Sequence, residues 1–260
     1  MRMPVLLYHA LFDKDSNRKK YEINVREFER QIKYLSDNGY RSFLVDDFLK
    51  TDGSSAAADG KGIVITFDDG SYSDYSMALP VLRKYGFTAT FFVTVNWIGT
   101  ENYVDWSHLG KMSEEGMSIQ SHSLTHPFLS GLSREDMYKE LYESKKVLES
   151  RLNIPVDTIS IPGGFFSREV LRMAEEVGYR CVCTSVPGLN KLGSRAKGLL
   201  ILDRFVITRK TSFQNFKAIV NKEPGYIAAC KAQHYVKSAI KRLLGSERYY
   251  ALWSKYLRKV

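Results

Sequence analysis

Residues 63–70 read Ile-Val-Ile-Thr-Phe-Asp-Asp-Gly, a short apolar run that ends in two carboxylates and a glycine. The β-branched run predicts a buried strand over residues 63–66. In parallel α/β proteins the carboxyl ends of the strands open onto the functional face, so we expect Asp68 and Asp69 there. Two adjacent carboxylates repel each other unless a cation or a hydrogen-bond donor separates their roles. Taken alone, Asp-Asp-Gly is also a common turn sequence, so a second signal is needed.

Outside this stretch, short apolar runs alternate with helical patterns. Repeated alternation of this kind favours parallel strands joined by right-handed crossovers. Because several such units fit into about 220 residues, an α/β barrel is favoured over an open sheet. Strands are predicted over residues 5–8, 40–44, 63–66, 88–93, 118–120, 158–161, 179–183 and 200–202. Helices are predicted from residue 25 to a stop at Gly39, and over residues 74–85, 133–152, 167–177 and 212–220.

The composition is typical of a globular protein. The chain has 260 residues, of which 44% are hydrophobic and 26% charged, and no apolar run reaches the about 18 residues of a membrane-spanning helix. The first nine residues lack the long apolar core and cleavage site of a signal peptide. Cys181 and Cys183 are expected on one face of a buried strand and in no metal site, because two thiols supply too few ligands. We therefore expect a cytoplasmic protein.

The formal charge of +9 is concentrated at the C-terminal end. Residues 226–260 carry eight Lys and Arg against Glu247 alone, which leaves residues 1–225 close to neutral. Because the excess of basic residues is confined to this one segment, we do not expect nucleic-acid binding. Apolar side chains recur there at helical spacing, so we predict a barrel domain over 1–225 and a basic amphipathic helical extension over 226–260. The extension either packs on the barrel with its basic face in water or contacts an anionic membrane at its inner face.

Residues 120–127, Gln-Ser-His-Ser-Leu-Thr-His-Pro, supply the second signal. Two histidines four residues apart in a helical turn project to one face, an arrangement that suits a divalent ion. The chain has only five histidines, and two stand here. With an aspartate from a neighbouring strand end, His122 and His126 predict a His₂Asp site. Such a site keeps coordination positions open, as catalytic sites do.

Residues 66–70, Thr-Phe-Asp-Asp-Gly, and the His-Ser-x-x-His-Pro of residues 122–127 resemble the first two motifs of the polysaccharide deacetylases, the NodB-homology group of carbohydrate esterase family 4. The resemblance covers about residues 5 to 207. It implies a distorted (β/α)₇ barrel and the metal-dependent removal of N- or O-acetyl groups from sugars. It also implies that Asp68 is the general base and that Asp69, His122 and His126 hold the metal. That metal is usually zinc, with Ni²⁺, Co²⁺, Fe²⁺ and Mn²⁺ as alternatives.

The third motif of the family departs from its usual pattern here. Residues 160–164 read Ser-Ile-Pro-Gly-Gly where the family has Arg-x-Pro-aromatic-Gly. Ser160 therefore replaces the arginine that orients the base, and we expect Arg204, at the end of a late strand, to substitute for it. An ion pair between Arg204 and Asp203 is the alternative. The N–H of Gly163 is a candidate oxyanion donor, with a plain glycine-rich turn as the alternative.

The late Leu-x-His motif, which carries the catalytic acid in the family, is missing. After residue 126 the only histidine is His234. The chain resembles subfamilies that deacetylate poly-N-acetylglucosamine and carry a Tyr-His motif ahead of the Asp pair, and this resemblance implies that His9 is the general acid. The alternative for His9 is a strand-end side chain that bonds a loop. His108, in a predicted helix, is expected to be structural.

These observations predict a metal-dependent carbohydrate deacetylase acting on the N-acetyl groups of an acetylated sugar, a polysaccharide or a lipid-linked precursor. The expected compartment points to O-antigen, capsule or exopolysaccharide biosynthesis. The alternative, suggested by Ser160 and the missing late histidine, is an impaired pseudoenzyme that binds metal and glycan. Aromatic residues near the motifs are candidates for stacking on a sugar, with core packing as the alternative: Tyr72, Trp97, Tyr103, Trp106 and Phe165.

Overall fold

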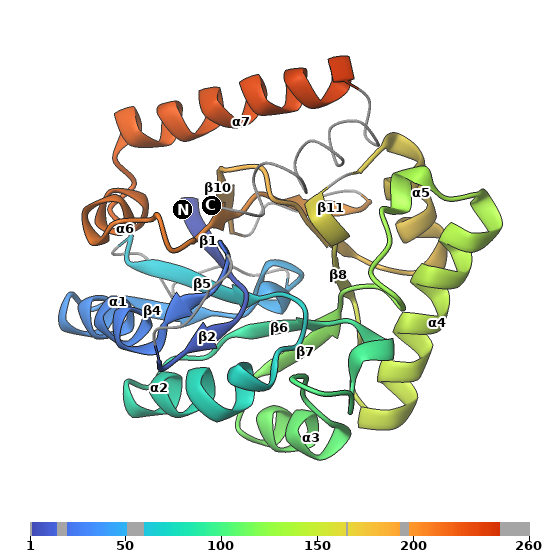
Figure 1. Ribbon diagram of the computed structural model, residues 1–260, viewed down its shortest axis with the longest axis horizontal. Coiled ribbons are helices and arrows are strands. Elements are labelled where there is room, and N and C mark those ends of the chain that lie inside the picture. Colours follow the sequence, from blue (N-terminus) through green and yellow to red (C-terminus); the bar gives the residue numbers. More distant parts are fainter. Residues whose placement is uncertain (1, 15–19, 51–59, 165, 193–197, 245–260) are drawn as a thin grey trace.

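The computed structural model describes residues 2–14, 20–50, 60–164, 166–192 and 198–244, with side chains as far as Ala239. Its main sheet curls into a nearly closed barrel surrounded by helices α1 to α5 (Figure 1). Seven parallel strands follow one another around the barrel: β1 (Arg2–Tyr8), β5 (Gly62–Phe67), β6 (Thr90–Val93), β7 (Ser118–Ser121), β8 (Thr158–Ser160), β9 (Cys181–Cys183) and β11 (Leu200–Leu202). The predicted α/β barrel is confirmed.

Short strands complete the barrel at its edges. Strand β12 (Phe205–Val206) follows β11 after two residues and pairs with β1, so this one stretch of chain connects the last strand to the first. Strand β4 (Arg41–Phe43) pairs with the start of β5, and β10 (Leu189–Lys191) runs antiparallel to β1. A separate pair, β2 (Leu11–Phe12) and β3 (Ile23–Asn24), lies beyond β1. Strands β2, β3, β10 and β12 were not predicted, because two or three residues are too few to show a period.

The helices begin and end where the capping signals predict. The side chains of Ser133 and Ser167 accept hydrogen bonds from the N–H groups of Asp136 and Val170, and Gly178 ends a helix in the left-handed conformation. The segment predicted over residues 74–85 opens as a π-helical stretch, η2, before α2. The helices are α1 (Val25–Asp37), η2 (Asp74–Ala78), α2 (Leu79–Lys84), α3 (Trp106–Glu114), α4 (Arg134–Leu152), α5 (Arg168–Val177), α6 (Phe213–Val220) and α7 (Pro224–Leu244).

Alternation along the strands separates two apolar clusters. In β5, Ile63 and Ile65 belong to the large cluster, whereas Val64 belongs to a smaller cluster that also holds Cys181 and Cys183. The two cysteines are free and fully buried, as predicted for one face of a strand. Because side chains two apart share a face, the row that contains Val64 continues through Thr66 to Asp68. This row places Asp68 at the carboxyl end of the barrel.

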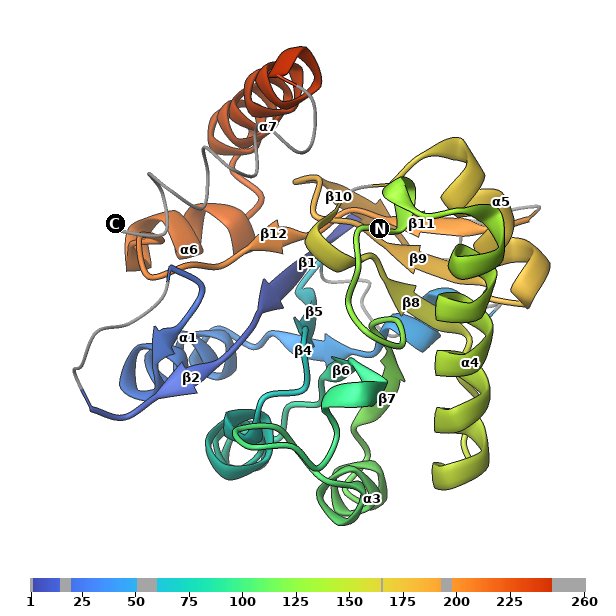
Figure 2. The same cartoon turned by 45° about the vertical axis from the view of Figure 1, so that its right-hand side comes forward.

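The first part of the predicted basic extension, residues 226–244, belongs to helix α7. It lies beyond α6 on the outside of the barrel in both views (Figures 1 and 2). Tyr226, Ile227 and Cys230 pack against the core, whereas Tyr235 and Val236 are 62% and 60% exposed. Residues 245–260 of the predicted extension lie outside the described residues. Within the described part of the chain, no helix is long and apolar enough to span a bilayer.

Candidate active site

The residues singled out by the sequence gather where the strands end. His9 follows β1, Asp68 and Asp69 follow β5, and His122 follows β7. Ser160 is the last residue of β8, and Arg204 stands in the two-residue link between β11 and β12. These side chains share one end of the barrel because its strands are parallel.

Asp68 and Arg204 form a buried bidentate ion pair. Arg204 Nη1 donates to Asp68 Oδ1 at 2.8 Å, and Nη2 donates to Oδ2 at 2.9 Å. Asp68 is 3% exposed and Arg204 is 0% exposed. Burial by itself raises the pKa of Asp68, but the charges of Arg204 and His122 and the hydrogen bond from Arg204 hold that pKa below its ordinary value. Asp68 is therefore an ionised, oriented carboxylate.

Ser160 completes the surroundings of this ion pair. Its hydroxyl donates to Asp68 Oδ2 at 2.8 Å and accepts from Arg204 Nη2 at 2.7 Å. The structure thus places Arg204 against Asp68, as expected from the Ser160 departure. Asp203 instead accepts a hydrogen bond from the Thr184 hydroxyl at 3.2 Å. No feature of the sequence predicts that Ser160 itself contacts both partners.

Asp69, His122 and His126 converge at one point. Asp69 Oδ1 lies 3.4 Å from Nε2 of His122 and 3.4 Å from Nε2 of His126. Among the described residues, this is the one cluster of three or more His, Cys, Asp or Glu side chains close enough to share an ion. Burial raises the pKa of Asp69, but its contacts with the two imidazoles bring that pKa well below its ordinary value.

The distances from the Asp69 carboxylate to the two imidazoles suit a shared divalent ion. Bonds of about 2.0–2.2 Å in tetrahedral geometry place neighbouring ligand atoms about 3.3–3.5 Å apart, which matches the two distances to Asp69 Oδ1. His122 Nδ1 lies 2.8 Å from the carbonyl oxygen of Ser160, so Nδ1 donates to that carbonyl and Nε2 is the ring nitrogen that faces Asp69. The side chains of Asp69 and His126 keep 30% and 25% exposure, which leaves the cluster reachable from solvent.

The helical turn predicted for residues 122–126 is wrong. Ser123 and His126 have φ angles of 68° and 67°, in the left-handed region, and the segment is an irregular loop. We refer to residues 122–126 as the histidine loop. A serine hydroxyl stabilises its reversal, because Ser123 Oγ accepts from the N–H of His126 at 3.0 Å. The two rings still meet, with centroids 4.9 Å apart, but through loop geometry and not through helical spacing.

His9 is brought to the same end of the barrel. The N–H of Asp68 donates to the carbonyl oxygen of Tyr8 at 3.0 Å, which sets His9 beside the Asp pair. The His9 ring stacks on Tyr21 at 4.9 Å, and its Nδ1 is buried with no hydrogen-bond partner within the described ranges. Burial lowers the pKa of His9, against the opposing charges of Asp69 and Asp68. The role of His9 as general acid and the alternative of a strand-end side chain that bonds a loop both stay predictions.

The remaining residues singled out by the sequence are a glycine, a histidine and several aromatic side chains, and their surroundings differ. Gly163 lies in a left-handed turn after β8, with φ of 62°, and its role as an oxyanion donor stays a prediction. The centroid of the Trp97 ring lies 4.9 Å from the ring centroids of both His126 and Tyr103, so Trp97 packs against one histidine of the cluster. His108 forms a capping box with Asp105 at the start of α3, a contact in keeping with the structural role expected of it. Phe165 lies outside the described residues. Tyr72 is 44% exposed, and Trp106 packs against the core.

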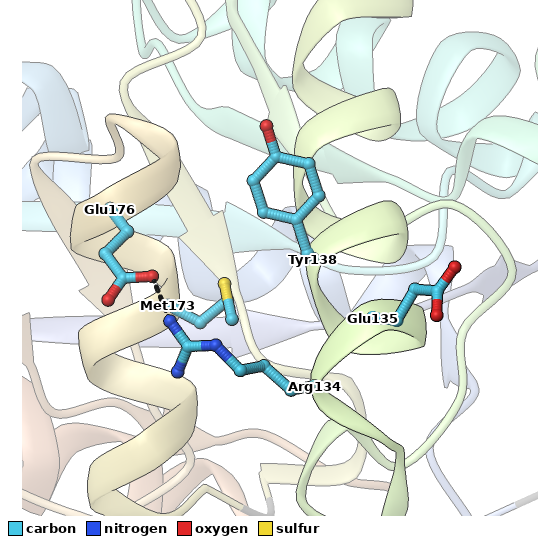
Figure 3. Close-up of a pocket in the computed structure, with 5 residues that line it drawn as sticks. All are labelled: Arg134, Glu135, Tyr138, Met173 and Glu176. Atoms are coloured by element: carbon cyan, nitrogen blue, oxygen red, sulfur yellow. Dashed lines mark hydrogen bonds and ion pairs between the residues drawn. The ribbon is translucent and has the colours of Figure 1, made fainter.

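A shallow groove between α4 and α5 lies on the outside of the barrel (Figure 3). It is crossed by an ion pair between Arg134 and Glu176 at 2.7 Å. No residue of the candidate site lines it, so we assign the groove no part in the chemistry.

The fold and the strand-end cluster define a class, that of α/β barrels with a candidate site for a divalent ion. A family model described as "Polysaccharide deacetylase" matches residues 55–182. The "Putative polysaccharide deacetylase YxkH" of Bacillus subtilis (strain 168) is 32% identical over 219 residues, 84% of this chain and 76% of that relative. This chain belongs to the polysaccharide deacetylase family.

Two further relatives agree with this assignment. The "Poly-beta-1,6-N-acetyl-D-glucosamine N-deacetylase" of Staphylococcus aureus (strain MRSA252) is 26% identical over 185 residues, 65% of this chain but only 63% of that enzyme. The solved structure "Streptococcus pyogenes deacetylase PplD in complex with acetate" has a TM-score of 0.76 and 27% identity, and covers 85% of this chain and 98% of that chain. The predicted deacetylase barrel and hydrolase class are confirmed.

Proposed function

We propose that this polysaccharide deacetylase removes N-acetyl groups from hexosamine units with the help of one divalent ion, Zn²⁺ by its ligand set, held by Asp69, His122 and His126. The observation that carries the proposal is the convergence of both imidazoles on Asp69 Oδ1 at 3.4 Å. When bound, a divalent ion supplies Lewis-acid polarisation of the acetyl carbonyl and makes water at the site more acidic. The N-acetylglucosamine named for the Staphylococcus aureus relative supports the choice of sugar.

Asp68 is the proposed general base. Arg204 and Ser160 fix both of its oxygens, and Arg204 keeps it ionised, as a base must be before it accepts a proton from the attacking water. His9 is the proposed general acid, which gives a proton to the departing amine. The hydrogen bond from the Asp68 N–H to the Tyr8 carbonyl, which holds His9 beside the Asp pair, supports this role. Gly163 is the proposed donor to the oxyanion.

Acetate release from N-acetylglucosamine oligomers tests this proposal. We expect Asp68→Asn to lose activity while retaining its bound ion, because Asp68 is oriented by Arg204 and stands outside the ligand cluster. Asp105→Asn, which alters an aspartate in the cap of α3, is the matched control and should keep activity. Acetate release that is unchanged in Asp68→Asn would overturn the proposed mechanism. Binding of oligomer and ion by the wild type without acetate release would favour the second candidate, a glycan-binding pseudoenzyme.

The site of action is a separate part of the proposal. A cytoplasmic location at the inner membrane face, with a lipid-linked precursor of O-antigen, capsule or exopolysaccharide as substrate, is supported by the free cysteines and by the basic excess of residues 226–260. Exposed Tyr235 and Val236 on α7 would contact the bilayer. The full chain should co-sediment with vesicles containing anionic lipid and be released by salt. Equal recovery with neutral vesicles would contradict this.

A further inference from the structure

Glu140 on α4 is a buried acid that the proposed reaction does not use. It is 8% exposed, and its carboxylate faces the histidine loop. Oε2 accepts from the N–H groups of Leu124 and Thr125, each at 2.9 Å, and Oε1 accepts from the Thr125 hydroxyl at 2.6 Å. All three bonds lead to the segment between the two histidines. Buried glutamates are rare in proteins, and all the side-chain hydrogen bonds described here for this one are made to a single loop.

The backbone N–H groups of the histidine loop are all paired, and Glu140 pairs two of the five. His122 N–H donates to the Val93 carbonyl at 2.9 Å, Ser123 N–H to the Ser121 hydroxyl at 3.2 Å, and His126 N–H to the Ser123 hydroxyl at 3.0 Å. The other two N–H groups, those of residues 124 and 125, point at Glu140. Successive N–H groups aimed at one point form an anion-binding concavity, and here a side chain of the same protein fills it.

The opposite side of the loop is tied to the segment after β6. The N–H groups of Val95 and Asn96 donate to the carbonyl oxygens of Ser123 and Leu124, at 3.2 and 2.9 Å. The loop is therefore held between this segment and α4. Since two of its residues are left-handed and none is glycine, external bonds are needed to keep this conformation.

We infer that Glu140 is a positioning residue for the ion site: its carboxylate fixes the histidine loop so that Nε2 of His126 stays within reach of Asp69. This inference rests on the proposed function, because it concerns the same ligand cluster. Hydrogen bonds to a charged acceptor are roughly twice as strong as neutral ones, so the charge of Glu140 matters as well as its shape. Loss of these bonds frees the loop and moves His126 away from the other two ligands.

Three variants separate charge from shape. Glu140→Gln keeps the shape, since its amide oxygen can accept from both N–H groups and its NH₂ can donate to the Thr125 hydroxyl. Glu140→Ala removes all three bonds. Glu135→Gln, on the exposed side of the same helix, is the matched control. We expect the dissociation constant for Zn²⁺ to rise about 10–100-fold in Glu140→Ala, by analogy with outer partners of metal ligands, less in Glu140→Gln, and not in Glu135→Gln.

Amide hydrogen exchange of the metal-free protein supplies a readout that needs no ion. Exchange at residues 124 and 125 should accelerate in Glu140→Ala, partly recover in Glu140→Gln, and stay at the wild-type rate in Glu135→Gln. Equal Zn²⁺ affinity of wild type and Glu140→Ala, with Zn²⁺ bound by both, would overturn this inference and leave the proposed function intact. A wild type that binds no divalent ion would overturn the proposed function, and the exchange experiment would still show whether Glu140 holds the loop.

Discussion

Replacing Arg204 by methionine should destabilise the protein more than any surface substitution. Methionine keeps much of the volume and removes the guanidinium, which donates to both oxygens of Asp68 and also to the Thr66 hydroxyl, the Ser160 hydroxyl and the Thr184 carbonyl. Both partners of the ion pair are buried. Removing one partner of a buried pair leaves an uncompensated charge, which costs about 3–5 kcal/mol. We expect Arg204→Met to lower the free energy of unfolding by that amount at pH 7.

Urea denaturation of the metal-free protein measures this loss. Arg180→Met is the control, because Arg180 is 58% exposed and pairs with Asp157 at 3.5 Å, a contact worth about 0–1 kcal/mol. The double variant Asp68→Asn/Arg204→Met should recover most of the loss, since it removes both charges of this ion pair and leaves neither partner unpaired.

The effect of Arg204→Met should also depend on pH. The folded-state pKa of Asp68 lies below its unfolded value, so the ion pair stabilises the protein above about pH 4, and this contribution is lost as the pH falls through the folded pKa. The difference between wild type and Arg204→Met should therefore shrink in acid. A loss below about 1 kcal/mol at pH 7, or a double variant no more stable than Arg204→Met, would refute this reasoning.

Three other substitutions have definite expected outcomes. Burial and the charges of Asp68 and Asp69 raise the pKa of Asp74, so wild-type stability should fall as the pH rises from about 4 through that raised pKa. Urea midpoints of Asp74→Asn should lack this decline. If the midpoints of wild type and Asp74→Asn change in parallel with pH, the raised pKa of Asp74 is refuted. His9→Gln should lower kcat about 10²–10⁴-fold with Zn²⁺ affinity retained, whereas a change confined to KM would exclude an acid role. Ser133→Ala should lower stability by about 1 kcal/mol in thermal melts through loss of the bond to the Asp136 N–H, and an unchanged melt would mean that this cap contributes little.

Much of the fold follows from local signals in the sequence. Ser133, Ser167 and Gly178 mark helix ends because capping is a short-range interaction, and the apolar run before Asp68 marks its strand. Strand β12 escapes such an analysis because its two residues owe their conformation to pairing with β1, about 200 positions away in the chain. Pairing between distant segments leaves no period in either of them.

The site shows the same division between local and distant causes. The spacing of His122 and His126 correctly pointed to shared orientation, but the same spacing arises from a helical turn or from a loop with left-handed residues. Which of the two forms depends partly on Glu140, more than ten positions further on, whose carboxylate holds the loop. Arg204 could be suggested as the substitute for a missing arginine, yet its bidentate contact with Asp68 depends on how β11 and β12 close the barrel.

The central claim is that Asp69, His122 and His126 share a single cation. Zn²⁺ titration of chelator-stripped protein by calorimetry tests this claim most directly, with His126→Ala as the ligand variant and His234→Ala, on α7, as the histidine control. We expect one ion per chain for the wild type and the control, and a large loss of affinity for His126→Ala. Wild-type stoichiometry and affinity in His126→Ala, or no binding by the wild type, would contradict the claim.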